Sequence, residues 1–142
     1  MRMLTMLPLL GLAVLAYVAA SWMQGADMVV WLGSEFHTIT NLPSGGEMGL
    51  EITNGDLFVL VGLFLLAMEI IKSTNTKGFS MANHGFSMLV FVIALFLFLT
   101  VEGYATSVFL MLLVMTLVDV MGMMITIVTA RRDIGLGGFD AG

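Results

Sequence analysis

The stretch MLLVMTLVDVMGMMITIV, residues 111–128, places a single acidic residue, Asp119, inside an otherwise apolar run. The run belongs to a longer apolar segment, 106–130, which as a helix would be about 37 Å long and could cross the hydrocarbon core of a bilayer. An acidic residue near the bilayer centre costs roughly 2.5–3.5 kcal/mol, whereas each Leu, Ile, Val or Phe contributes about −0.3 to −0.6 kcal/mol. The segment therefore predicts a transmembrane helix with Asp119 close to its midplane.

Three further apolar segments precede this one, at 4–23, 56–71 and 85–101. They are continuous rather than alternating, which favours helices over a β-barrel. The chain is 59% hydrophobic with a mean hydropathy of +1.05, whereas soluble domains are roughly 45–50% apolar. We therefore predict an all-α integral membrane protein in which residues 1–132 form a domain of four transmembrane helices. The first segment, with its basic start and VAAS at 18–21, also fits a signal peptide; we favour a retained helix because the run is long.

The basic residues predict one orientation for these helices. All five lie before the first segment, between the second and third, or after the fourth: Arg2, Lys72, Lys77, Arg131 and Arg132. Loops rich in Lys and Arg stay in the cytoplasm, so we expect both termini and the tail 133–142 to be cytoplasmic. The loop 25–55 carries acidic residues and no Lys or Arg, and is predicted to form a small acidic cap on the extracytoplasmic side. Its apolar flanks are expected to form either short strands or an interfacial segment.

Asp119 belongs to a stripe of small and polar residues along the fourth segment. Its residues follow one another at steps of three or four along the sequence: Thr116, Asp119, Gly122, Thr126 and Thr129. Such residues let helices approach closely and form hydrogen bonds across the contact, so this face is predicted to point into the bundle or towards a partner. Three interpretations remain open: a protonated Asp119 bonded to a neighbouring helix, which we favour, an ion- or proton-handling site, and contact with a partner subunit.

Charged residues also occur at the cytoplasmic ends of the segments. Glu69 and Lys72 are spaced i,i+3 and are expected to form an interfacial ion pair, while Arg131 and Arg132 would anchor the fourth helix at the cytoplasmic face. Glu69 lies near the end of its segment, whereas Asp119 lies far from the end of its own. Counting from these ends, we do not expect Glu69 to reach Asp119.

Several function classes find no support in the sequence. There is no cysteine, and the net charge of −5 argues against nucleic-acid binding, which usually needs a basic face. No nucleophile–base arrangement or phosphate-binding loop is recognisable, and the predicted topology puts His37 and His84 on opposite sides of the membrane. We predict no enzyme, and no catalytic, cofactor-binding or metal-binding residues.

The C-terminal run LVDVMGMMITIVTARRDIGLGG, residues 117–138, resembles the ends of uncharacterised small four-helix bacterial inner-membrane proteins. The resemblance covers roughly residues 56–138 and rests on the mid-helix VD and the exit TARRD. It implies a multi-pass protein of the bacterial cytoplasmic membrane and marks Asp119 and residues 131–133, without implying an activity.

These observations lead to three functional hypotheses. The leading one is a non-catalytic accessory or scaffold subunit of a larger membrane complex, since four short helices bury little surface alone. The first alternative is a small, self-associating ion- or proton-coupled channel or transporter that uses Asp119. The second alternative is a membrane protein that binds a lipid or a quinone between its helices.

Overall fold

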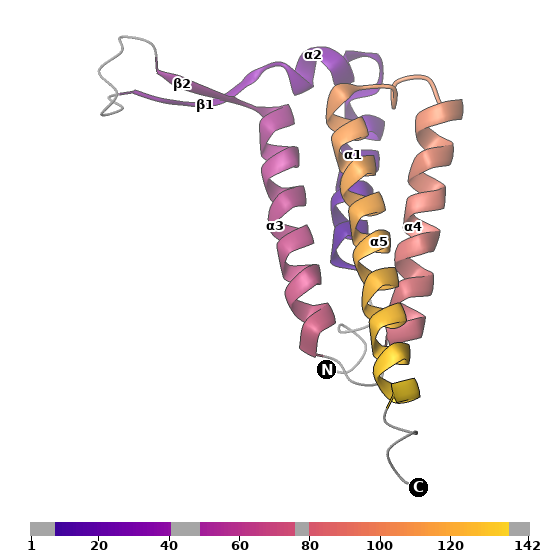
Figure 1. The fold of residues 1–142 in the computed structure, drawn as a ribbon. Helices are drawn as coiled ribbons and strands as arrows, with labels where there is room; N and C mark the ends of the chain where they lie inside the picture. Colours follow the sequence, from indigo (N-terminus) through magenta and orange to yellow (C-terminus); the bar gives the residue numbers. More distant parts are fainter. Residues whose placement is uncertain (1–7, 41–48, 76–79, 137–142) are drawn as a thin grey trace, which may run out of the picture.

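The computed structural model describes residues 8–40, 49–75 and 80–136. Its architecture is mostly helical, with four long helices packed side by side (Figure 1). They are α1 (Leu9–Gln24), α3 (Asn54–Asn75), α4 (Ser80–Thr100) and α5 (Ser107–Leu136). Neighbours along the chain run in opposite directions, so α3 and α5 both descend from the end of the bundle that carries the predicted cap. We call this the outer end.

The segment between α1 and α3 contains short helices and strands. After α1, Gly25 adopts a positive φ of 54°, which glycine tolerates better than other residues, and the chain continues through η1 (Gly25–Asp27) and α2 (Met28–Leu32). Strands β1 (Glu35–Ile39) and β2 (Leu50–Thr53) then pair antiparallel and project sideways from the outer end (Figure 1). The prediction of a mostly helical protein is confirmed, and of the two alternatives for this segment the structure shows short strands, which form a two-stranded sheet.

Helices α4 and α5 form an antiparallel pair joined by a tight turn. Gly103 makes this turn possible with a φ of 93°. The rings of Phe98 and Phe109 stack at 6.5 Å across the pair. This contact fixes the register of α4 against α5. A residue a given number of positions before Phe98 lies at about the same height as the residue the same number of positions after Phe109.

Tyr17 lies at the centre of an aromatic cluster near the outer end. Its buried ring contacts Phe58, Tyr104 and Phe109 at centroid distances of 5.5, 6.0 and 4.8 Å. Its hydroxyl lies 2.5 Å from Thr106 Oγ1, which also accepts a 3.1 Å hydrogen bond from the backbone N–H of Phe109. One threonine thus begins α5 and ties it to α1, because a hydroxyl at a helix start satisfies an N–H that has no partner within the helix.

The helices differ from the predicted segments mainly at their ends. The segments expected at 56–71, 85–101 and 106–130 correspond to the longer or shifted helices α3, α4 and α5, and α1 covers the described part of 4–23. Helix α5 continues to Leu136, so the first residues of the expected tail, 133–142, are helical. Its exit sequence TARRDIGL contains no proline and does not break the helix.

Within the described residues, two stretches are long and apolar enough to cross a membrane. They are Leu9–Leu32 and Asn54–Lys72, of 24 and 19 residues; Gly85–Thr100 and Ser107–Gly122 are shorter apolar stretches. Within the most apolar 18 residues of each longer stretch, only 28% and 17% of the residues are buried. Apolar residues such as Leu15, Phe64 and Phe96 are each about two-thirds exposed. The outside of the bundle is therefore apolar, unlike that of a helix bundle adapted to water.

Candidate functional site

Glu69 is completely buried, with 0% of its side chain exposed, and connects two helices. Its Oε2 accepts a 2.6 Å hydrogen bond from the backbone N–H of Leu9, the first residue of α1. Its Oε1 lies 2.8 Å from Lys72 Nζ, whose side chain is 18% exposed. The N-terminus of a helix carries unpaired N–H groups and a partial positive charge. The carboxylate therefore caps α1 from a different helix.

The structure adds a second contact to the expected ion pair. Glu69 and Lys72 form the i,i+3 contact, and Glu69 is in addition buried against the start of α1. The sequence pattern shows the charge spacing within one helix. It does not show that the start of another helix, α1, lies against the same turn and offers a second donor.

Glu69 also lies at nearly the same height as Asp119. A Cβ added to Gly62 on α3 would lie 2.8 Å from Leu112 Cδ2 and 3.0 Å from Met115 Sδ on α5, which aligns these positions. Glu69 lies seven residues after Gly62 on α3, and Asp119 lies seven residues after Leu112 on α5. Because α3 and α5 run in the same direction (Figure 1), the two carboxylates lie within about one helical turn in height.

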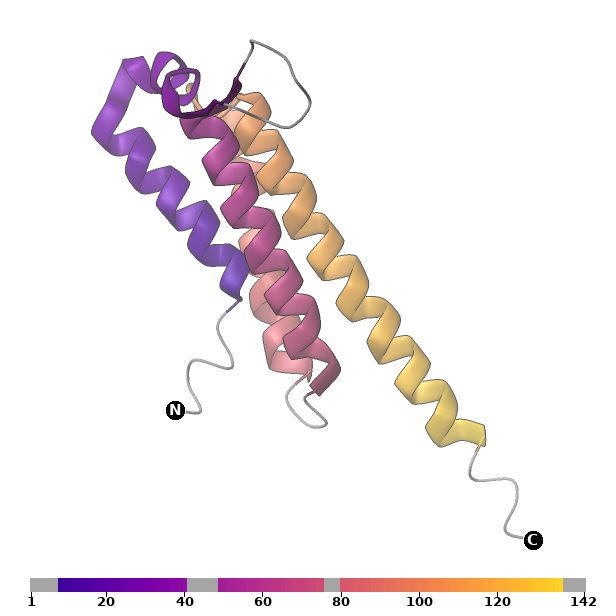
Figure 2. The ribbon, with the colours of Figure 1, turned by 90° about the vertical axis from the view of Figure 1, so that its left-hand side faces the viewer.

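The expectation that Glu69 and Asp119 lie at different depths is therefore wrong. It rested on counting residues from the cytoplasmic ends of the two segments. Helix α5 extends well past the end of α3 (Figure 2), so this count places Asp119 too far from Glu69. The packing of Gly62 against α5 gives the correct alignment.

Ser87 on α4 adds a third polar group at this height. Its side chain is 2% exposed, and its Oγ has no hydrogen-bond partner within the described structure. Gly11 on α1 lies against Val90 on α4, which puts Ser87 level with Leu9, because α1 and α4 run in the same direction. The stacked Phe98 and Phe109 independently put Ser87 level with Asp119. We call Glu69, Lys72, Ser87 and Asp119 the polar layer.

The described residues of the predicted stripe on α5 are buried as far as Asp119, and Gly122 beyond it is exposed. Thr116 and Asp119 are buried, with Asp119 5% exposed, and Thr116 Oγ1 donates a 2.7 Å hydrogen bond to the carbonyl of Leu113. Gly122 is exposed, and a Cβ added to it would meet no described atom within 4 Å. Of the two directions expected for this face, into the bundle or towards a partner, the described structure shows no packing inside the bundle at Gly122, and contact with a partner stays a prediction. Four predicted site residues lie outside the described side chains: Thr126, Thr129, Arg131 and Arg132.

The close approach of helices occurs instead on α3, at two glycines that sequence reasoning did not single out. A Cβ on Gly55 would lie 2.8 Å from Val108 Cγ2 and 3.1 Å from the carbonyl oxygen of Leu32, and Gly62 is equally tight against α5. Their spacing of seven residues, which is two helical turns, is the signal that could have identified this face. Ser87 and Ala94 repeat that spacing on α4, and both are buried.

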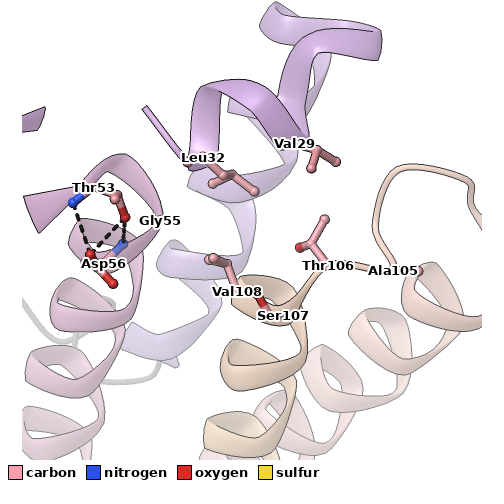
Figure 3. Close-up of a pocket in the computed structure, with 10 residues that line it drawn as sticks. Val29, Leu32, Thr53, Gly55, Asp56, Ala105, Thr106, Ser107 and Val108 are labelled. Atoms are coloured by element: carbon pink, nitrogen blue, oxygen red, sulfur yellow. Dashed lines mark hydrogen bonds between the residues drawn. The ribbon is translucent and has the colours of Figure 1, made fainter. Parts of the chain in front are cut away.

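Two hollows lie away from the polar layer. A cavity of about 460 Å³ opens at the outer end among α2 and the starts of α3 and α5 (Figure 3). The carboxylate in it, Asp56, caps α3 by accepting hydrogen bonds of 3.0 and 2.8 Å from Thr53 N–H and Oγ1. A smaller apolar groove, of about 210 Å³, lies between α1 and α4 beside Gly11 and Val90.

Within the described part of the chain, no group of three or more His, Cys, Asp or Glu residues is placed to hold a metal ion. The chain matches no protein-family model, and no curated protein or solved structure is significantly similar to it. The polar layer, the two glycines of α3 and the exposed part of α5 therefore form the basis for assigning a function.

Proposed function

We propose that this protein crosses the bacterial cytoplasmic membrane four times, with both termini in the cytoplasm. The apolar exterior of the bundle supports this proposal, because exposed side chains such as Leu15, Phe64 and Phe96 suit lipid tails and not water. The polar layer points inward, as polar groups at membrane depth do. The basic residues are absent between Arg2 and Lys72, which agrees with an extracytoplasmic outer end.

Within that membrane, we infer that the protein is a non-catalytic accessory subunit of a larger complex. The observation that carries this function is the exposed face of the inner half of α5, the helix whose inner end extends beyond the other helices (Figure 2). Helix α5 has 30 residues and α4 has 21, so their lengths are about 45 and 32 Å. The inner half of α5 has four apolar side chains that are more than half exposed: Met121, Met124, Ile125 and Val128.

Gly122 lies among these exposed side chains and offers the point of closest approach. Small residues at membrane helix contacts let two backbones come close together. Gly122 does not serve any helix of its own bundle in this way, because the space beside it is open in the described structure. A helix of a partner subunit would fill this space. We define Met121, Gly122, Met124, Ile125 and Val128 as the docking face.

A matched pair of glycine substitutions tests this function. Gly122→Leu should block the docking face and lose a stoichiometric partner during purification in mild detergent. Gly85→Leu is the control, because Gly85 on α4 is also exposed and equally open; it should keep the partner. Both variants should fold normally, as judged by thermal unfolding. Recovery of the wild-type protein only as a lone homo-oligomer would contradict the proposal.

The polar layer favours a second candidate, a small ion- or proton-coupled channel or transporter. Acidic side chains inside a membrane bundle often mark ion or proton pathways, and two of them, Glu69 and Asp119, lie at one height here. Flux measured in proteoliposomes should then disappear in Asp119→Asn while the protein remains assembled. If the variant instead assembles poorly and the wild-type protein shows no flux, Asp119 has a structural role.

The groove between α1 and α4 favours a lipid- or quinone-binding role as a third candidate. Its walls are apolar and include Leu12, Phe86 and Ile93, which suit an acyl or isoprenoid chain. Mass spectrometry of extensively washed protein should then detect one lipid or quinone species in stoichiometric amount. A mixture that mirrors the bulk membrane lipids would contradict this role.

A further inference from the structure

The ribbon formed by β1 and β2 projects sideways from the outer end of the bundle (Figure 1). In the described part of the chain, its sheet consists of these two strands. A two-stranded ribbon is at best marginally stable in water and gains stability when one of its faces packs on another surface. The distribution of its side chains indicates which face does so.

One face of the ribbon is apolar. Directly opposed residues of an antiparallel pair lie on the same face, and neighbours along a strand alternate between faces. Ile39 is paired with Leu50, and His37 with Ile52, so these four side chains share one face. Ile39 and Leu50 are 38% and 51% exposed. We call Ile39, Leu50 and Ile52 the ribbon's apolar face.

The opposite face of the ribbon is polar and acidic. Thr38 is paired with Glu51, and Glu35 is paired with Thr53 across an irregularity in the ladder. The hydroxyl of Thr38 donates a hydrogen bond to the carboxylate of Glu35, which shows that both side chains lie on the same side despite the irregularity. The ribbon is therefore amphipathic.

A further hollow, of about 340 Å³, connects the ribbon to the exterior of α3. It is lined by Leu50 and Ile52 of β2 and by Val59 and Leu60 of α3, together with Glu51 and Asp56. Leu60 is 53% exposed and belongs to the apolar exterior of the bundle. Because the hollow joins these residues, the ribbon's apolar side chains continue the exterior of α3, and whatever covers that exterior reaches the ribbon.

We propose that the ribbon's apolar face lies on the lipids of the outer leaflet, at the level of their headgroups. The inference rests on the proposed membrane location of the bundle, in which lipid covers the exterior of α3. It extends the lipid-exposed surface sideways, beyond the helices. The outer edges of the two strands carry N–H and C=O groups that need hydrogen bonds, so the ribbon belongs at the wet interface and not in the hydrocarbon core.

The charges around the ribbon indicate that the contact depends on apolar area. Segment 25–55 contains no Lys or Arg, whereas anchors that select anionic lipids are rich in these residues. The carboxylates of Glu35 and Glu51 lie on the face opposite the apolar one. We therefore expect the contact to form in vesicles of zwitterionic phosphatidylcholine alone. A contact that forms only when anionic lipid is added would overturn the proposal.

Spin labels on single cysteines test the contact, because the chain has no native cysteine. Leu50→Cys and Ile39→Cys place the label on the apolar face, and the adjacent Glu51→Cys and Thr38→Cys are matched controls on the opposite face. In phosphatidylcholine vesicles, each label's collisions with oxygen, which concentrates in lipid, are compared with its collisions with a water-soluble nickel complex. We expect the ratio of oxygen to nickel collisions to be several-fold higher on the apolar face.

The other outcomes each overturn the contact. Equal ratios at all four positions would place the whole ribbon in water. Labels on the apolar face that collide with neither reagent would assign this face to protein, either a second copy of the chain or a partner subunit. The two apolar-face variants are independent of each other, so failure of one to fold leaves the other as the test.

A label at Phe64→Cys separates this inference from the membrane location on which it rests. Phe64 is 66% exposed on α3 and should collide with oxygen and not with nickel if the bundle is embedded in lipid. A Phe64 label in lipid with a Leu50 label in water would overturn only the ribbon contact. A Phe64 label in water would contradict the membrane location itself.

Discussion

Glu69 holds the start of α1 against α3, although its charge would be costly in a membrane without partners. The carboxylate lies between the N–H of Leu9 at 2.6 Å and the ammonium of Lys72 at 2.8 Å. Charged hydrogen bonds of this kind are stronger than neutral ones. Burial of the acid is tolerable because one of its oxygens accepts from a helix N-terminus and the other contacts a positive group.

At the residue scale, removing this carboxylate should destabilise the whole bundle. Glu69→Ala leaves Lys72 without its carboxylate and Leu9 without its acceptor, and breaking a buried pair in this way costs about 3–5 kcal/mol. Glu69→Gln should cost less, because an amide oxygen can still accept from Leu9. The measurement is reversible unfolding in detergent. Glu102→Ala, an exposed control, should change the free energy of unfolding by less than about 0.5 kcal/mol; an equal loss in both would contradict this role.

At the element scale, α3 approaches α5 and the end of α2 closely at two glycines, Gly55 and Gly62. Its two buried glycines allow α5 and the end of α2 to approach, since any side chain at Gly55 would meet Val108 and the carbonyl of Leu32. Val108 is β-branched and therefore stiff, and a backbone carbonyl cannot move without moving α2. A side chain at Gly55 therefore has no room at the outer end of the bundle.

Two alanine substitutions should therefore change stability in opposite directions. In Gly55→Ala the new Cβ would lie 2.8 Å from Val108 Cγ2 and 3.1 Å from the carbonyl oxygen of Leu32. Overpacking of this kind costs roughly 1–3 kcal/mol. Gly122→Ala meets nothing within 4 Å in the described structure, and alanine is better than glycine within a helix by about 0.8–1.0 kcal/mol. Unfolding of both variants in the same detergent gives the comparison. Destabilisation by Gly122→Ala as large as that by Gly55→Ala would contradict the packing described.

At the scale of the whole molecule, the helical framework could be predicted because long continuous apolar runs are typical of membrane helices. The polar stripe predicted that Asp119 faces the bundle or a partner and not lipid, since exposing a carboxylate to lipid is costly, and Asp119 is buried in the bundle. The depth of Glu69 could not be predicted, because it depends on how far α5 extends past α3. The strand pair was one of two alternatives that the sequence left open, since its short segments of mixed polarity lack a clear period.

Ser87 shows the same limit within the candidate site. A single serine in an apolar segment does not by itself indicate a site. The height of Ser87 in the bundle follows from two contacts between other residues, Gly11 with Val90 and Phe98 with Phe109. These contacts bring α1, α4 and α5 into register and place Ser87 beside the height of Asp119. Only the packed structure contains that information.

Labelling with a membrane-impermeant maleimide tests the four-span arrangement most directly, because the chain has no native cysteine. Single cysteines are introduced at Glu35, Asn75 and Glu102 and labelled in intact spheroplasts and after permeabilisation. We expect Glu35→Cys and Glu102→Cys to react in intact spheroplasts and Asn75→Cys only after permeabilisation. If only the two longest apolar stretches cross the membrane, Glu102→Cys will behave like Asn75→Cys, and that result would contradict the four-span account.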